Sequence, residues 1–162
     1  MKTMLNLILI LVVAVSSAFA EDSTMVAAAK VFPGVRFHEG VRDPLLTRLA
    51  QEYASEMASI NSQSKGWGRR RQGHFGWDAR YATIRSQLGM KGVEVSSETW
   101  KWQANAAMAE VGAEMFRTWR QSNGPYPYAD HWGVVSKPHK RYGDGLARSR
   151  AGIWYGTIIV AD

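Results

Sequence analysis

The sequence has no cysteine among its 162 residues. Disulfides are therefore excluded, packing alone must hold the fold together, and no thiol follows the N-terminal apolar run to carry a lipid. The local metal motif His-Glu-x-x-His and the nucleophile motif Gly-x-Ser-x-Gly are also missing, so neither a site of that spacing nor a serine nucleophile is supported. No internal repeat is present. A functional site must therefore be assembled from residues that lie far apart in the chain.

The sequence also lacks an apolar run long enough for a confident membrane span, since the N-terminal run covers only residues 7–15. Lys2 precedes this run, and Ala18 and Ala20 end it with a small-x-small pattern. The pattern predicts a secretory signal peptide over residues 1–20, cleaved near Ala20 before Glu21, with an uncleaved anchor as the alternative. The mature chain is expected to be secreted, either extracellular or periplasmic, without a transmembrane segment, and to be a monomer or weak dimer.

Acidic residues are too few to balance the basic ones, and the formal net charge is +6. Much of the excess lies in the basic cluster from Lys65 to Arg71, where Trp67 interrupts the charged residues. Such a cluster can bind anionic polymers, lipid headgroups or nucleic acid. A solvated loop explains the same composition and is the favoured interpretation, so nucleic acid is not an expected partner.

The first firm helix is predicted to begin after Asp43, a good N-cap residue, with Pro44 at the first helical position. Apolar residues then recur at steps of three and four, and the pattern ends near Asn61. Residues 21–42 show no clear period and are interpreted as an N-terminal arm laid over the domain. Residues 62–73 are rich in glycine and arginine, which is typical of a loop.

Periodicity predicts two more helices, at residues 77–88 and from about 105 to 119, and three strands, at residues 131–136, 142–149 and 152–161. A brief strand-like piece covers residues 93–95. The last strand is apolar on both alternating faces, which is typical of a central strand that is covered on both sides. Helices followed by strands indicate an α+β fold over residues 43–162, a three-layer α-β-α sandwich with an antiparallel central sheet.

Three polar residues within an aromatic-rich framework form the candidate site: His74, Glu98 and His131. Neutral imidazole nitrogens and a carboxylate suit a divalent ion such as zinc, with a position left open for water or a ligand. Without metal, two histidines near a glutamate can transfer protons near neutral pH. The alternative is structural: a histidine that caps a loop, a glutamate at a helix end and a histidine satisfied within a strand.

The order of these features from residue 45 to 160 resembles the CAP superfamily (cysteine-rich secretory proteins, antigen 5 and pathogenesis-related 1; also called SCP). His74 falls where that family has its first cleft histidine, and Glu98 where it usually reads Gly-Glu-Asn. Further similarities are Trp119-Arg120-Gln121-Ser122 to the bacterial Trp-x-x-Ser, His131-Trp132 to the His-aromatic signature, Tyr142-Gly143-Asp144-Gly145 to the Gly-x-Gly strand, and Ile153-Trp154-Tyr155 to the terminal aromatic strand.

The sequence departs from the family pattern at three points. Thr99 replaces the Asn expected after Glu98, and Ser122 stands where many eukaryotic members have a second glutamate. Residues 125–130 separate Gly124 from His131, which are almost adjacent in bacterial members. The family's tetrad of two histidines and two glutamates is therefore reduced, which counts against an activity that needs the second carboxylate.

The resemblance implies a secreted, bacterial-type CAP domain with a cleft formed by His74, Glu98, Ser122 and His131. The expected function is to bind a divalent metal, zinc or another, at His74 and His131, or a lipid- or peptide-like ligand of the cell envelope, or both. A metal-assisted hydrolase resembling a peptidase or esterase, with Glu98 as the candidate catalytic base, stays open. So does an adhesion module that binds anionic polymers through the basic cluster. Whether the protein is an enzyme is undecided at this point.

Overall fold

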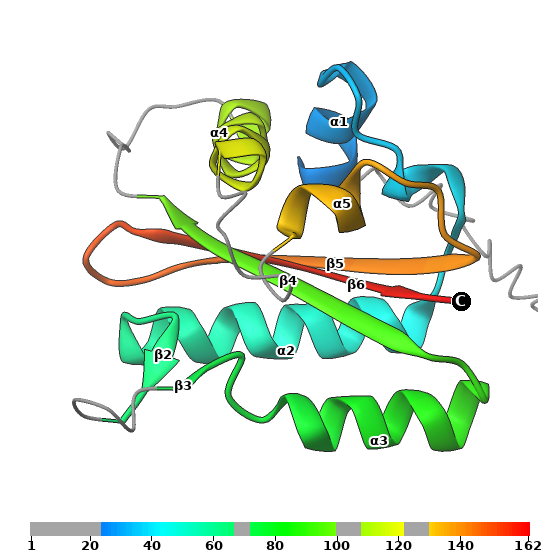
Figure 1. Ribbon diagram of the computed structural model, residues 1–162. Helices are drawn as coiled ribbons and strands as arrows, with labels where there is room; N and C mark the ends of the chain where they lie inside the picture. The colour runs from blue at the N-terminus through cyan, green and yellow to red at the C-terminus, as the bar shows by residue number, and fades with distance from the viewer. Residues whose placement is uncertain (1–23, 67–71, 100–107, 122–129) are drawn as a thin grey trace, which may run out of the picture.

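The computed structural model of the chain describes residues 24–66, 72–99, 108–121 and 130–162 (Figure 1). The predicted signal peptide, residues 67–71 of the basic cluster, Ser122 and the expected start of the third helix near Asn105 lie outside these ranges. The elements follow in the order α1 (Thr24–Val31), the 3-10 helix η1 (Phe37–Glu39), β1 (Val41–Arg42), α2 (Pro44–Ile60), β2 (Ser64–Lys65), β3 (Gln72–Gly73), α3 (Trp77–Leu88), β4 (Gly92–Thr99), α4 (Met108–Gln121), α5 (His131–Val135), β5 (Arg141–Arg148) and β6 (Trp154–Ala161).

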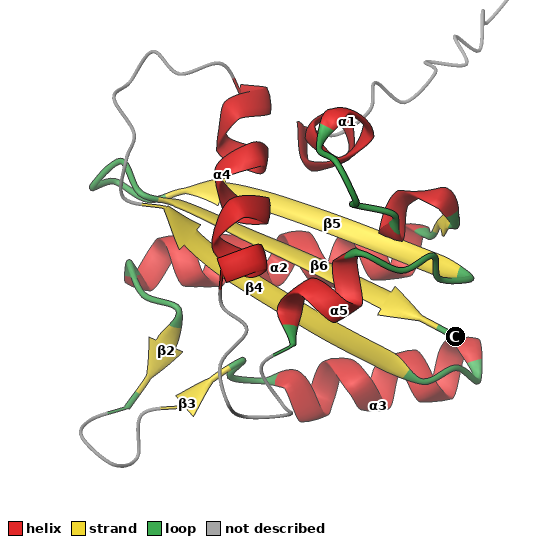
Figure 2. Ribbon diagram, turned by 45° about the horizontal axis from the view of Figure 1, so that its top comes forward, coloured by secondary structure: helices red, strands yellow, loops and turns green. Residues whose placement is uncertain are grey.

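One four-stranded sheet organises the described residues, in the order β1-β5-β6-β4. Figure 2 shows its three long strands, β5, β6 and β4. Strand β6 pairs antiparallel with β4 and with β5 and is buried along nearly its whole length, which confirms the prediction of a central, covered strand. Strand β1 pairs parallel with β5, so the sheet is mixed and not wholly antiparallel as predicted. Two residues are too short for an alternating pattern to reveal β1 in the sequence. The fold belongs to the α+β class.

Helix α2 begins and ends as the sequence predicts. The Asp43 side chain accepts hydrogen bonds from the amides of Leu45 at 2.9 Å and Leu46 at 3.2 Å, and Pro44 takes the first helical position. These bonds satisfy two of the amide groups that a helix start leaves without a partner. Asn61 ends the helix in the left-handed conformation, with φ at 53°. The cap residues thus set both ends of the longest described helix.

Helices lie on both sides of the sheet, with α2 and α3 on one side and α1, α4 and α5 on the other (Figure 1). Helix α2 runs along β5 and β6 and comes very close to β5, because Gly143 and Gly145 face it. A Cβ atom at Gly143 would meet the backbone of Leu46 and Thr47, and one at Gly145 would meet the backbone of Ala50. The glycines of the β5 motif therefore let a helix approach the sheet.

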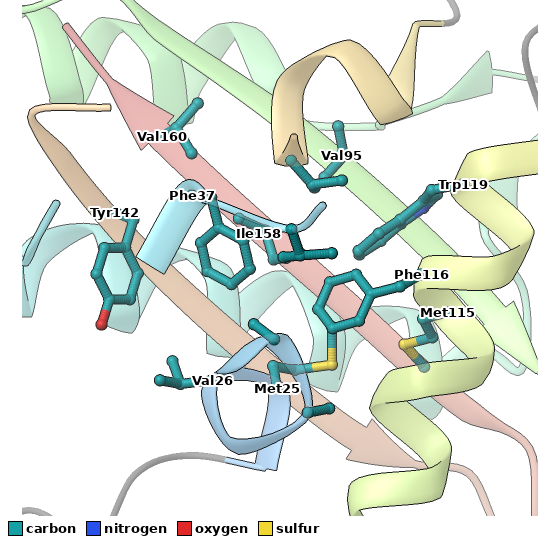
Figure 3. Packing of buried hydrophobic residues seen from close by; sticks show 14 of the residues in the cluster. Met25, Val26, Phe37, Val95, Met115, Phe116, Trp119, Tyr142, Ile158 and Val160 are labelled. Atoms are coloured by element: carbon teal, nitrogen blue, oxygen red, sulfur yellow. The ribbon is translucent and has the colours of Figure 1, made fainter. Parts of the chain in front are cut away.

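The largest group of buried apolar side chains lies between the sheet and the helices α1 and α4 (Figure 3). Phe116 of α4 packs against Phe37 of the N-terminal segment and against Trp119, in the same cluster as Met25 and Ile158. The described part of residues 21–42 forms α1, η1 and β1, and its apolar side chains pack into this core. The sequence pattern did not reveal the helix α1. A two-turn helix with small buried residues gives too short a pattern to read as an amphipathic helix.

The predicted strand over residues 131–136 is also wrong, because these residues form the short helix α5. Asp130 caps it, since its carboxylate accepts a hydrogen bond from the amide of Gly133 at 2.6 Å. Val134 and Val135 favour a strand by propensity, but tertiary packing decides such a short segment. The predicted loop over residues 62–73 contains the two short strands β2 and β3, which pair with each other. No helix in the described ranges combines the length and the apolarity that a membrane span needs.

Candidate functional site

A pocket of about 330 Å³ brings together three residues that lie far apart in the sequence. His74 follows β3, Glu98 lies near the end of β4, and His131 is the first residue of α5. The residues that line the pocket are Gln63, Ser64, Gly73, His74, Ser96, Glu98 and His131. Ser122, the fourth residue of the predicted cleft, lies outside the described residues. Two imidazoles and a carboxylate thus border one polar pocket.

The two imidazole rings face each other across this pocket. Their centroids are 6.2 Å apart, and the ring planes are inclined by only 23°. His74 has a φ of 50°, in the left-handed region that non-glycine residues rarely adopt. Such strained residues concentrate at functional sites, where the surrounding structure holds them in place. Its carbonyl accepts a hydrogen bond from the amide of Trp77 at 3.0 Å, which couples the His74 backbone to the start of α3.

The carboxylate that contacts the ring of His74 is that of Glu94, which was not among the site residues predicted from the sequence. His74 Nδ1 lies 3.0 Å from Glu94 Oε1. Arg80 also binds Glu94, with its Nε and Nη2 atoms each 2.7 Å from a carboxylate oxygen. Only 1% of the Glu94 side chain is exposed. When Nδ1 carries the proton, it donates this hydrogen bond to Glu94, and the lone pair of the ring lies on Nε2.

Tyr53 packs against both Arg80 and His74. The Arg80 guanidinium lies 3.9 Å from the centroid of the Tyr53 ring, and the His74 ring stacks on Tyr53 at a centroid distance of 6.4 Å. Burial, together with the nearby negative charge of Glu94, raises the pKa of Tyr53 to about 12. The buried Tyr53 and Glu94 therefore contact the ring of His74, and Arg80 contacts both of them.

Glu98 lines the same pocket and lies near the buried Tyr155. The Tyr155 hydroxyl donates to Asn61 Oδ1 at 3.4 Å. Burial, followed by the nearby charge of Glu98, raises the pKa of Tyr155 to about 12. Glu98 is half-buried, whereas Glu94 is buried on the same strand. The two carboxylates thus differ in their surroundings: Glu94 is enclosed by an arginine and a histidine, and Glu98 reaches the pocket.

The surroundings of His131 favour the neutral form of its imidazole. Burial, and then the neighbouring His74, lower its pKa, while Asp130 acts in the opposite direction. A lowered pKa keeps the imidazole uncharged at neutral pH, with a lone pair available to a proton or a metal ion. In the part of the chain that the structure describes, no set of three His, Cys, Asp or Glu side chains is arranged to hold a metal. Although His74, Glu98 and His131 line one pocket, they are therefore not arranged as a ready three-ligand site.

A signal for Glu94 was present in the sequence. Glu94, Ser96 and Glu98 occupy alternate positions, so they share one face of any strand that spans them. The strand predicted from the sequence ended at Val95, so it did not place Glu94 and Glu98 on one strand face. The structure extends β4 to Thr99 and places all three residues on the face towards the two histidines.

No protein-family model matches this sequence, and no curated protein matches it either. The resemblance to the CAP superfamily therefore stays a prediction that rests on the order of the motifs.

Proposed function

We propose that this protein is an exported CAP-type protein that binds a divalent metal ion such as zinc through ring nitrogens of His74 and His131. The remaining metal positions are left to water or to a ligand, which is a lipid- or peptide-like molecule of the cell envelope. The proposal includes the three-layer α-β-α sandwich of that family. Helices on both sides of the sheet and the antiparallel run β5-β6-β4 support this architecture.

One observation carries the proposal: two imidazoles from distant segments face each other over one open pocket, and one of them is held by a buried carboxylate. Histidines that bind metal usually donate their other ring nitrogen to a carboxylate or a carbonyl, which fixes the tautomer and the ring orientation. His74 has that arrangement through Glu94. The lowered pKa of His131 also favours the neutral form that a metal requires.

The metal-assisted hydrolase is a second candidate, and the observation that favours it is the position of Glu98 in the same pocket. A carboxylate beside a metal can accept a proton from bound water. Turnover of an ester or peptide substrate that stops with a chelator and in Glu98→Gln would support this role. Activity that persists in either condition would eliminate it.

The adhesion function is less favoured by the part of the basic cluster that is described. Lys65 pairs with Glu56, and its ammonium group lies 4.5 Å from the centroid of the Phe75 ring. A cation already matched by a carboxylate gains less from an anionic polymer. Binding through the cluster would fall steeply with salt and be lost when Arg69, Arg70 and Arg71 are replaced together.

The metal proposal is tested by zinc titration against a chromophoric competitor. The double variant His74→Ala/His131→Ala is expected to lose the site. The variant His139→Gln is the matched control, because His139 binds the C-terminal Asp162 and the carbonyl of Val134 and does not line the pocket. It should bind zinc like the parent protein. Equal zinc affinity in all three proteins would reject the proposal.

A further inference from the structure

A second cavity, of about 690 Å³, lies between the C-terminal end of α2 and the turn that joins β5 to β6. It shares no lining residue with the histidine pocket. Its polar lining residues are Ser55, Ser59, Asn61, Arg148, Ser149 and Arg150, and alanines form the remainder. A volume of this size is typical of sites that take small molecules.

The charge on this cavity has one sign. Arg148 and Arg150 line it, and none of its lining residues is acidic. Elsewhere in the described chain, the arginines that pair with a carboxylate are Arg36, Arg42, Arg48, Arg80, Arg117 and Arg141. No such pair is formed by Arg148 or Arg150 in the described ranges. Two guanidinium groups beside a cavity without a carboxylate favour an anionic ligand.

A tight turn holds the arginine side of the cavity. The amide of Ser149 donates to the carbonyl of Ile153 at 2.8 Å, and the amide of Gly152 donates to the carbonyl of Ser149 at 3.0 Å. Gly152 has a φ of 88°, which suits glycine. The guanidinium of Arg148 lies 5.8 Å from the centroid of the Trp154 ring, a contact that limits its freedom. Ordering of this kind reduces the entropy cost of binding.

The opposite side of the cavity is uncharged and rich in hydroxyl and amide groups. Ser55, Ser59 and Asn61 belong to the last turns of α2 and its C-cap. The C-terminal end of a helix carries partial negative charge, so an anion is disfavoured there, while hydroxyl donors are favoured. The cavity is therefore polarised, with cations on one side and groups that suit hydroxyls on the other.

We propose that this cavity binds the phosphate monoester of a polyol, such as a glycerol or sugar phosphate. The phosphate is bound by Arg148 and Arg150, and the hydroxyl groups of the polyol meet Ser55, Ser59 and Asn61. A phosphate monoester offers three terminal oxygens and up to two negative charges, which two guanidinium groups can share, whereas a carboxylate offers two oxygens and one charge. The same chemical group occurs on a phosphatidic acid headgroup, so the experiment must separate a soluble ligand from a lipid.

The test is calorimetric titration of the full-length protein with three probes: glycerol 3-phosphate, inorganic phosphate and glycerol. Saturable binding should follow the order glycerol 3-phosphate, then inorganic phosphate, with glycerol unbound. In Arg148→Gln/Arg150→Gln the affinity for glycerol 3-phosphate should fall by about 10-fold or more, since charge-assisted hydrogen bonds are lost. Ser55→Ala/Ser59→Ala should reduce the preference for glycerol 3-phosphate over inorganic phosphate. Both arginines are exposed, so unfolding temperatures should be unchanged.

The matched control is Arg85→Gln/Lys137→Gln, which removes the same charge from two exposed residues outside the cavity. It should leave the affinity unchanged. An equal loss in this control, or no saturable binding of any phosphate, would overturn the proposal.

Vesicles of phosphatidylcholine with phosphatidic acid form the second arm. Binding to these vesicles alone, lost in the arginine variant, would assign the phosphate to a lipid headgroup. The His74→Ala/His131→Ala variant should keep its phosphate binding, so failure of the metal proposal leaves this one standing.

Discussion

Replacing Glu94 by glutamine tests the network that holds His74. The substitution keeps the shape of the side chain and removes its charge. Glu94 is the carboxylate partner of Arg80, whose side chain is only 11% exposed, and it also contacts His74 Nδ1. In the variant the guanidinium keeps one backbone partner, the carbonyl of Phe75 at 3.1 Å, and its stacking on Tyr53. A buried cation would therefore lose its counter-charge.

The expected cost is large for a single isosteric change. Removing one partner of a buried ion pair typically destabilises a protein by 3–5 kcal/mol, and the glutamine oxygen can still accept one hydrogen bond, so we expect about 3 kcal/mol. That corresponds to a fall of roughly 10 °C in the melting temperature for a domain of this size. Glu98→Gln is the matched control, because it makes the same change four residues later on the same face of β4. Glu98 is half-buried, so about 1 kcal/mol or less is expected there.

The assay is urea unfolding followed by tryptophan fluorescence, with midpoints and slopes compared between variants. Arg80→Met/Glu94→Gln should be no less stable than Glu94→Gln alone, since it removes the uncompensated charge as well. Zinc affinity is a second readout: loss of a carboxylate behind a metal-binding histidine typically costs about 10–100-fold. Glu94→Gln and Glu98→Gln proteins of equal stability would refute the claim that Glu94 is the buried anchor of the site.

Two further predictions concern the packing of α2. Burial alone would raise the pKa of Asp43, but hydrogen bonds from Arg141 and from two amides at the start of α2 hold the pKa below its usual value of 3.8. Asp43→Asn should therefore lower the free energy of unfolding by about 1 kcal/mol near neutral pH, a small cost because Arg141 is partly exposed. In acid unfolding curves, this difference between variant and parent should vanish as the pH falls below 3.8. A difference that stays constant with pH would contradict this. Gly145→Ala should lower the free energy of unfolding in urea by at least about 2 kcal/mol, because its Cβ would meet the backbone of Ala50. Gly73→Ala is the control and should change stability little, because a Cβ there has nothing within 4 Å. Equal effects of the two substitutions would contradict the close approach of helix and strand.

The parts of the fold that could be predicted are those written in local patterns. Helix α2 was predictable because Asp43 and Pro44 mark its start and a repeated apolar stripe marks its buried face. Strand β6 was predictable because both of its faces are apolar. Such signals depend only on neighbouring residues, so they survive without any knowledge of the tertiary structure.

The parts that could not be predicted depend on contacts between distant segments. Helix α5 has only five residues, and its valines favour a strand by local propensity. The segment is nevertheless helical, because Asp130 caps it and Val135 is buried in the core. The choice between Glu94 and Glu98 as the partner of His74 is of the same kind. Both glutamates share a strand face, and only the packing of α3, which brings Arg80 to Glu94, decides between them. Histidine and glutamate residue types indicated the site, but the geometry assigned their roles.

The central claim is that His74 and His131 act together on one metal ion, with Glu94 holding the proton on His74 Nδ1. The most direct measurement is the nitrogen NMR spectrum of the histidine side chains during a zinc titration. We expect His74 Nε2 and one ring nitrogen of His131 to shift together in a single saturable step, while His74 Nδ1 stays protonated. A shift of only one of these two rings, or an equal response from His38 and His139, would contradict it.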